Sequence, residues 1–188
     1  MTRYARCRAL VSADATGTGI GLAIAKRLVE GGATVLLAVR GSEERAHAAA
    51  ELGSAARVVT PSAVEAALAR EGPTGVRDGV DLLFADTVPT ARPLLPHLEE
   101  GGAIVLTAAS PCPDAVRALA VELASRGIRV NAVAPGCIEA PGSGALPLPP
   151  LGRLGAAEEV ARAALFLATE ATFTTGVRFP VDGGLGRS

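Results

Sequence analysis

The chain has 188 residues, 49% of them hydrophobic, and a formal net charge of −1 at pH 7. This is enough for one domain with a sizeable core. No basic block or basic–aromatic stripe is present, so nothing predicts nucleic-acid binding. The three cysteines, Cys7, Cys112 and Cys137, are far apart, which argues against a disulfide framework or a metal site and favours a reducing cytoplasm. The start lacks the apolar run of a signal peptide, and no apolar run approaches the roughly 20 residues needed to span a membrane.

Short apolar runs alternate with helical stretches along the whole chain. A helix over residues 20–30 is indicated by Ile20, Ile24 and Leu28, which lie four apart on one face. Ser42 is the expected cap of the next helix. In chain order the pattern predicts strand 7–12, helix 20–30, strand 34–39, helix 43–52, strand 57–60, helix 61–70, strand 80–85, helix 91–100, strand 103–108, helix 113–126, strand 128–134, helix 156–168 and strand 175–181.

This alternation predicts a Rossmann-type α/β fold: a doubly wound parallel sheet of six or seven strands, with helices on both faces. The strands are almost wholly apolar, as expected for strands that are buried on both sides. We find no internal repeat and no low-complexity tail, so the sequence predicts a single domain over residues 1–188.

A glycine-rich turn joins the first strand to the first helix, with Gly17, Gly19 and Gly21 in it. Such a turn lets the backbone approach a pyrophosphate, and the helix N-terminus offers unpaired N–H groups and a partial positive charge. The alternative interpretation is that the glycines only permit tight packing of helix on strand.

Several blocks resemble the short-chain dehydrogenase/reductase superfamily, in the same order. The blocks are GIGLAIA at 19–25, GGATV at 31–35, ALAVELA at 118–124, GIRVNAVAPG at 127–136, GRLG at 152–155, and VDGG at 181–184. The resemblance is best from Val116 onward and is similar in flavour to the 3-oxoacyl-carrier-protein reductases. The spacing of the glycine turn is similar to that of the enoyl-carrier-protein reductases.

The resemblance implies the strand order 3-2-1-4-5-6-7 and NADP or NAD as the cofactor. Arg40, at the end of the second strand, would meet the 2′-phosphate of NADP, with a solvated surface arginine as the alternative. The backbone of Ile138 would meet the nicotinamide amide, with a plain turn as the alternative. The predicted cofactor-binding residues are Gly17, Gly19, Ile20, Gly21, Arg40, Pro135, Gly136 and Ile138.

The sequence departs from the family's pattern in three places, after the first, third and fourth predicted strands. The usual Thr-Gly after the first strand is replaced by Ser12 and Ala13, and Asp14 adds a negative charge near the pyrophosphate position. The Asn-Asn-Ala-Gly turn expected after the fourth strand reads ADTV at 85–88, and Thr60 stands near the position of an adenine-contacting Asp. These changes leave it open whether the chain still binds the cofactor.

The largest departure concerns catalysis. The family uses a tyrosine as proton donor and a lysine that lowers the pKa of that tyrosine. The only tyrosine here is Tyr4 and the only lysine is Lys26, both in the N-terminal region. The substrate loop and the Tyr-x-x-x-Lys segment are missing between residues 110 and 116, and Ser110 lies near the position of the catalytic serine. We therefore assign no catalytic residue.

Three hypotheses follow. The first is a degenerate family member that acts as a scaffold or partner subunit, as a homo-oligomer or with a related dehydrogenase, through residues 156–168 and 175–181. The second is an NAD(P)-dependent oxidoreductase that reduces a carbonyl or enoyl thioester through a non-standard site such as Ser110. The third is a repurposed enzyme without redox chemistry. Cys112 and Cys137, and likewise Asp86 and Glu139, are candidates to line one common cleft.

Overall fold

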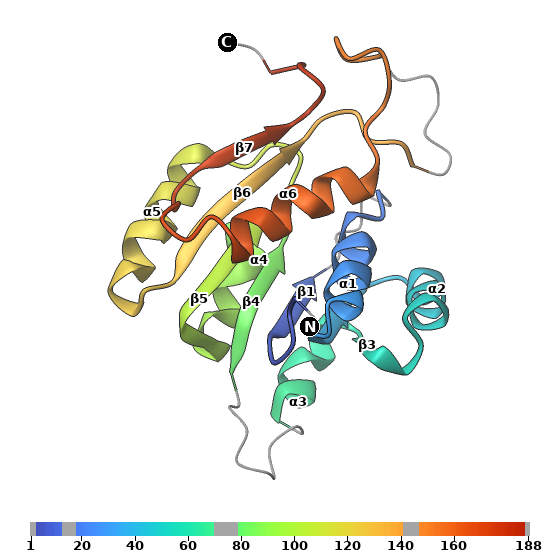
Figure 1. Cartoon of the computed structure of the whole chain (residues 1–188). Coiled ribbons are helices and arrows are strands. Elements are labelled where there is room, and N and C mark those ends of the chain that lie inside the picture. Colours follow the sequence, from blue (N-terminus) through green and yellow to red (C-terminus); the bar gives the residue numbers. More distant parts are fainter. Residues whose placement is uncertain (1–2, 13–17, 70–78, 141–146, 187–188) are drawn as a thin grey trace.

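The computed structural model describes residues 3–12, 18–69, 79–140 and 147–186. Seven strands form one sheet in the order β3-β2-β1-β4-β5-β6-β7, and every neighbouring pair is parallel. This order confirms the predicted fold class (Figure 1). The strands are β1 (Arg8–Ser12), β2 (Thr34–Ala38), β3 (Ala56–Val59), β4 (Val80–Ala85), β5 (Leu98–Leu106), β6 (Arg129–Pro135) and β7 (Arg178–Val181).

Helices cover both faces of this sheet. They are α1 (Ile20–Glu30), α2 (Ser42–Leu52), α3 (Val64–Ala69), α4 (Val88–Ala91), α5 (Pro113–Leu123) and α6 (Ala157–Thr169), with 3₁₀ turns at Gly53–Ala55, Pro61–Ala63, Arg92–His97 and Ala124–Arg126. The buried side chains of α1, α2 and α6 pack in one core, and those of α3, α4 and α5 pack in a second core on the opposite face. Strand β1 contributes to both, because Val11 points into the first core and Leu10 into the second.

One predicted helix, over residues 91–100, is wrong in both boundaries. The helical segment begins at Val88, where Thr87 and Thr90 form a capping box. It continues as the 3₁₀ turn Arg92–His97, which contains two prolines that cannot donate a backbone hydrogen bond. Leu98 then starts β5 by pairing with Val80 of β4, so the last residues of the predicted helix belong to a strand.

The predicted capping role of Ser42 is also wrong. Ser42 is the first residue of α2, and the capping position is held by Gly41 without a side-chain hydrogen bond. The carboxylate of Glu44 lies against Gly41 instead. A Cβ placed on Gly41 would be 1.4 Å from one of its oxygens. An acidic side chain in the first turn stabilises a helix N-terminus through the helix dipole.

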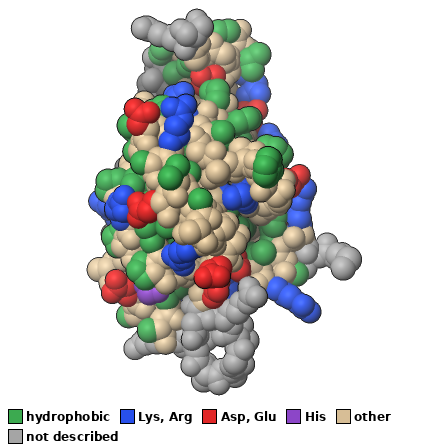
Figure 2. All heavy atoms as spheres, turned by 90° about the vertical axis from the view of Figure 1, so that its left-hand side faces the viewer, with side chains coloured by type: hydrophobic (Ala, Val, Ile, Leu, Met, Phe, Trp, Pro, Cys, Tyr) green, Lys and Arg blue, Asp and Glu red, His purple; other side chains and the backbone are tan. Residues whose placement is uncertain are grey.

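Strand β7 forms one edge of the sheet and is less buried than its neighbours. Its register with β6 pairs Arg178 with Ala132 and Phe179 with Val133. Ala132 belongs to the core under α5 and Val133 to the core under α6, so Arg178 faces the α5 side and Phe179 the α6 side. Figure 2 views the molecule from the left of Figure 1, where α5 lies, and shows hydrophobic and charged side chains interspersed on this surface.

Among the described residues, no helix is both long enough and apolar enough to cross a membrane.

Candidate functional site

The N-terminus of α1 is the part of the site that a dinucleotide phosphate would meet. Gly19 precedes the helix with φ +74°, a left-handed conformation that favours glycine. The capping residue is thus a glycine without a side chain, and the first turn carries no acidic group. Ile20 is buried in the core, so only its backbone can contact a ligand, while Gly21 is half-buried. Gly17, like Ala13 and Asp14, lies outside the described residues.

A cavity of about 450 Å³ adjoins Gly19 on the outer side of α1. It lies between α1, α2 and the start of α6, and Glu51, Glu139 and Glu158 line it together with Lys26. Lys26 forms an ion pair with Glu51, and this hydrogen bond raises the pKa of Lys26. The cavity carries more carboxylates than cations, which disfavours phosphate there.

Arg40 follows β2 and its side chain is exposed. The guanidinium of Arg45, in the first turns of α2, donates a hydrogen bond of 3.3 Å to the backbone carbonyl of Arg40. Two arginines therefore lie near the carboxyl end of β2, which is where a 2′-phosphate would approach. The carboxylate of Glu44 lies on the same turn and offsets part of this positive charge.

Pro135 and Gly136 lie where β6 ends next to β7. A Cβ on Gly136 would lie 2.6 Å from Cα of Asp182, so packing of the two strand ends already requires glycine there. Pro135 is buried as the last residue of β6. For both residues, packing alone accounts for the residue type.

The turn after β6 is bridged to Gly155 on either side of Ile138. Gly155 donates to the carbonyl of Cys137 at 2.9 Å and accepts from the N–H of Glu139 at 2.8 Å. Because peptide groups alternate in direction along an extended segment, the N–H and carbonyl of Ile138 point away from Gly155. The Ile138 side chain is buried.

The carboxyl ends of β4 and β5 enclose a small cavity of about 180 Å³, lined by Ser110, Asp86, Thr87 and Cys112 among others. The two connections that leave these strands are joined directly, because Thr107 donates to the carbonyl of Ala85 and Ala108 to that of Asp86, at 2.9 and 3.0 Å. Helix α5 begins soon afterwards, at Pro113. Ser110 therefore lies in a small cavity at the carboxyl ends of the strands, where open α/β sheets bind their ligands.

Tyr4 lies at the amino ends of the strands, opposite to the carboxyl ends where this cavity lies. Its ring is buried against Gly31, where a Cβ would be 2.1 Å from Cδ2 of Tyr4, and its N–H donates to the Gly31 carbonyl at 2.7 Å. Gly31 ends α1 and leads into the amino end of β2. Tyr4 is thus a packing residue at the amino ends of the strands. Lys26 forms an ion pair with Glu51 on the outer surface of α1.

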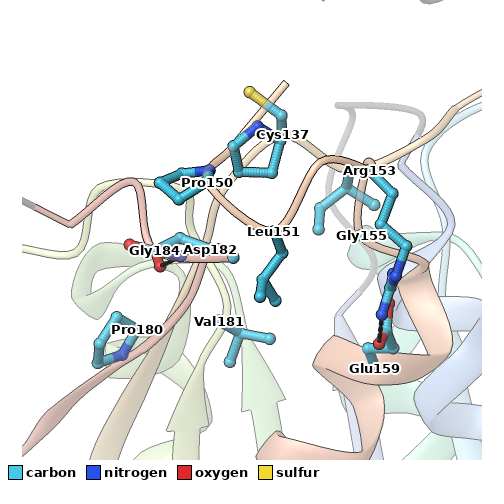
Figure 3. A pocket seen from close by; sticks show the side chains of 13 residues that line it. Cys137, Pro150, Leu151, Arg153, Gly155, Glu159, Pro180, Val181, Asp182 and Gly184 are labelled. Carbon is cyan, nitrogen blue, oxygen red and sulfur yellow. Dashed lines mark hydrogen bonds and ion pairs between the residues drawn. The ribbon is translucent and has the colours of Figure 1, made fainter. Parts of the chain in front are cut away.

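Within the described part of the chain, the two cysteines line different cavities, and so do the two acids. Cys112 and Asp86 line the small cavity with Ser110, whereas Glu139 lines the cavity beside α1. Cys137 lies on a further cavity of about 500 Å³ at the carboxyl ends of β6 and β7 (Figure 3). One common cleft for either pair therefore stays a prediction.

Sequence reasoning missed the ion pair that borders this further cavity. Both terminal nitrogens of the Arg153 guanidinium donate to the carboxylate of Glu159 at 2.8 Å, and Glu159 also accepts from the N–H of Ala156 at 3.0 Å. These hydrogen bonds, that of Arg153 above all, lower the pKa of Glu159 to about 2. The acidic pair at the start of α6 signalled a helix terminus, but nothing in the sequence signalled the arginine partner.

Residues 111–186 match the family model described as enoyl-(acyl carrier protein) reductase. Among curated proteins, the chain is 51% identical over 76 residues to a 3-oxoacyl-[acyl-carrier-protein] reductase of Thermotoga maritima and 48% identical over 79 residues to that of Pseudomonas aeruginosa. These alignments cover 35% and 37% of this chain, but only 31% and 32% of the relatives. An L-fucose dehydrogenase of Bos taurus is 34% identical over 143 residues, 58% of this chain and 53% of that protein.

Solved structures match over almost the whole chain. An apo short-chain oxidoreductase from Pseudomonas aeruginosa, described as containing an atypical catalytic center, superposes with a TM-score of 0.78 at 23% identity, covering 98% of this chain and 99% of that one. A short-chain dehydrogenase from Burkholderia cenocepacia in complex with NADP gives 0.75 at 25% identity, covering 97% and 98%. By its motifs, its sheet order and these similarities, the chain is similar to the short-chain dehydrogenase/reductase superfamily and has the same fold, and its C-terminal part is similar to the 3-oxoacyl-carrier-protein reductases.

Proposed function

We propose that the chain is a degenerate short-chain dehydrogenase/reductase-like protein without the family's tyrosine–lysine redox activity, acting as a scaffold or partner subunit. One observation carries the proposal. The only tyrosine packs on Gly31 at the amino end of β2, and the only lysine is paired with Glu51 on α1, so neither side chain lies at the carboxyl ends of β4 and β5. Losing a positioned proton donor costs typically 10²–10⁴-fold in rate.

The proposal includes a single Rossmann-like domain over residues 1–188 that lacks the substrate loop and the Tyr-x-x-x-Lys segment between residues 110 and 116. Only residues 107–112 separate β5 from α5, and the hydrogen bonds of Thr107 and Ala108 tie this connection to the end of β4. The three cysteines are free, which suits a reducing compartment and supports placement in the cytoplasm.

The partner surface that we propose consists of the outer side of α6 and the edge strand β7. Three of the four phenylalanines are exposed there: Phe166 on α6, Phe173 after it and Phe179 on β7. Phe173 is fully exposed and the other two are more than two-fifths exposed. A concentration of exposed aromatic side chains is typical of protein–protein interfaces. The partner is a second copy of the chain or a related dehydrogenase.

Light scattering across a range of protein concentrations tests this proposal. We expect an oligomer, and we expect Phe166→Ser combined with Phe179→Ser to convert it to a monomer. Val121→Ser on α5 is the control, because Val121 is an even more exposed apolar residue on the opposite face of the sheet. A wild-type chain that stays monomeric, both alone and mixed with a related 3-oxoacyl-carrier-protein reductase, contradicts the partner role.

A second candidate function is an NAD(P)-dependent oxidoreductase that reduces a carbonyl or enoyl thioester through a non-standard site. The N-terminus of α1 at Gly19, Ile20 and Gly21, the exposed Arg40 and the peptide groups of Ile138, which point away from Gly155, support it. When bound, the cofactor would supply the hydride. The N–H groups of α1 would hold the phosphates, Arg40 the 2′-phosphate of NADP, and Ile138 the nicotinamide amide, with Gly17, Pro135 and Gly136 shaping the neighbouring turns.

Calorimetric titration with NADPH and with NADH separates the two candidates. The oxidoreductase requires binding, and Arg40→Ala should then weaken NADPH by about tenfold while leaving NADH within twofold. Ser110→Ala should lower any reductase rate, whereas Lys26→Met should not. No binding of either nucleotide at millimolar concentration excludes this candidate.

A further inference from the structure

A cavity of about 500 Å³ opens at the carboxyl ends of β6 and β7 (Figure 3). Its walls come from three separate segments: the turn after β6, residues 149–155, and residues 180–184. Open α/β sheets bind ligands outside the carboxyl ends of their strands, in cavities of roughly 300–1,000 Å³. The position and the size of this cavity are those of a small-molecule site.

The surface that faces this cavity is mainly apolar. In Figure 3 the side chain of Leu151 points toward Val181, while the sulfur of Cys137 lies at the far rim. Leu151 lines the cavity and is 71% exposed, so much of its side chain is open to contact. A ligand that covered Leu151 would remove this apolar surface from water, which is the main driving force for binding apolar molecules. The apolar lining residues are Ile138, Pro149, Pro150, Leu151, Pro180 and Val181.

The charged groups of the walls already have hydrogen-bond partners within the chain. Arg153 makes two hydrogen bonds to Glu159 and a third to the carbonyl of Leu154. One carboxylate oxygen of Asp182 accepts from the N–H of Gly184 at 2.9 Å. An anionic ligand would have to displace Glu159 from Arg153, and would also lie close to the Asp182 carboxylate. The walls therefore disfavour an anionic ligand, and their mainly apolar surface disfavours burial of any unpaired charge.

The walls are held in place by contacts within the chain. Leu151 donates to the carbonyl of Gly183 at 3.1 Å. Gly183 and Gly184 have φ of +63° and +92°, which favour glycine, and a Cβ on Gly183 would lie 2.9 Å from Pro149. Little ordering is then required when a ligand binds, which lowers the entropic cost of binding.

We propose that this cavity is a binding site for a neutral, mainly apolar small molecule, such as a compound with an aliphatic chain or ring. The site goes beyond the proposed partner role and requires no nucleotide. The ligand would lie between the ends of β6 and β7 and the segment before α6, and its binding would not depend on the tyrosine–lysine pair.

Titration of the protein with 1-octanol, followed by ¹³C-methyl NMR, tests this site. We expect saturable shifts of the Leu151, Val181 and Ile138 methyl signals, with Val121 on α5 unchanged. Leu151→Ser should raise the dissociation constant by about tenfold, because most of one apolar side chain is lost from the contact. Leu148→Ser is the matched control: Leu148 lies on the same segment and is 59% exposed, but does not line the cavity, so its effect should stay within twofold.

Three results would overturn the proposal. The first is a linear, non-saturating shift of all exposed methyl groups. The second is an equal effect of Leu151→Ser and Leu148→Ser. The third is a set of cavity shifts that grow with protein concentration in the absence of octanol, which means that a second copy of the chain covers the cavity. All of these readouts are independent of the nucleotide titration, so the site and the oxidoreductase candidate fail or succeed separately.

Discussion

The guanidinium of Arg129 on β6 donates a hydrogen bond of 2.6 Å to the backbone carbonyl of Leu167, in the last turn of α6. The same guanidinium also reaches the carbonyls of Ala168 and Ala171. Carbonyls at the end of a helix lack partners within the helix, and a cation there also complements the helix dipole. Arg129 thus ties the end of α6 to the sheet, although burial lowers the pKa of its side chain.

Arg129→Met should destabilise the protein by about 2 kcal/mol, because up to three carbonyls lose a charged donor. Arg129→Lys should recover only part of this, since an ammonium cannot reproduce the planar fork of the guanidinium. Urea unfolding followed by circular dichroism measures both changes. Arg178→Met on the exposed edge strand is the control and should change the unfolding free energy by less than about 0.5 kcal/mol. Equal effects of the two methionine variants would contradict the role assigned to Arg129.

Asn131 should be equally sensitive. It is fully buried in β6, donates to the carbonyl of Thr174 at 2.8 Å and accepts from the N–H of Val177 at 3.2 Å. Asn131→Leu keeps the volume but leaves two backbone groups without their partner, at a cost of about 2–4 kcal/mol. Amide hydrogen exchange should show faster exchange at Val177 in this variant. Unchanged protection of Val177 would mean that β7 is held in place without the asparagine.

The Arg153–Glu159 pair predicts a dependence of stability on pH. The folded-state pKa of Glu159 lies near 2, below its ordinary value of 4.5. The stabilisation is therefore complete above about pH 4.5 and is lost progressively as the pH falls toward 2. Glu159→Gln and Arg153→Met should each flatten the curve of unfolding free energy against pH within this window. A wild-type curve with the same slope as the curve of Glu159→Gln would exclude the pair as the cause.

Gly31 and Tyr4 form a pair suited to a double-mutant cycle. The backbone of Gly31 has φ −79°, which any residue adopts, so a destabilising effect of Gly31→Ala would come from the Tyr4 ring and not from backbone strain. We expect Gly31→Ala to cost about 2 kcal/mol in the presence of Tyr4, and clearly less in a Tyr4→Ala background. Thermal unfolding of the four proteins measures the coupling. Additive effects would show that the ring moves aside freely.

The fold followed from the sequence where local pattern and tertiary packing agree. The bounds of α1 matched the prediction, because Ile20, Ile24 and Leu28 mark the buried face and Gly31 ends the helix. The segment after β4 did not, because its prolines are compatible with both a short helix and a 3₁₀ turn. Whether Leu98 belongs to that helix or to β5 depends on pairing with Val80, which no local pattern encodes.

The candidate site was less predictable for the same reason. The sequence placed Gly19 and Arg40 at strand–helix junctions, because such junctions are defined by neighbouring residues. It gave no sign that Cys112 and Cys137 line different cavities, since that depends on how the turns after β5 and β6 pack. Arg129 escaped notice because its partners on α6 lie about forty residues away in the chain.

The edge position of β7 has a consequence for how copies of the chain can meet. Val177 accepts a hydrogen bond from Ala132 of β6, and Val181 accepts one from Gly136 just after β6. By alternation, the peptide groups of Arg178 and Pro180 point outward. Pro180 has no N–H, which removes a donor from the middle of this exposed edge. A further strand therefore cannot pair with β7 through a full set of backbone hydrogen bonds, which is a common protection against edge-to-edge aggregation. Molecules that associate along this side must do so through side chains such as Phe179, which favours a defined complex over an open-ended fibre.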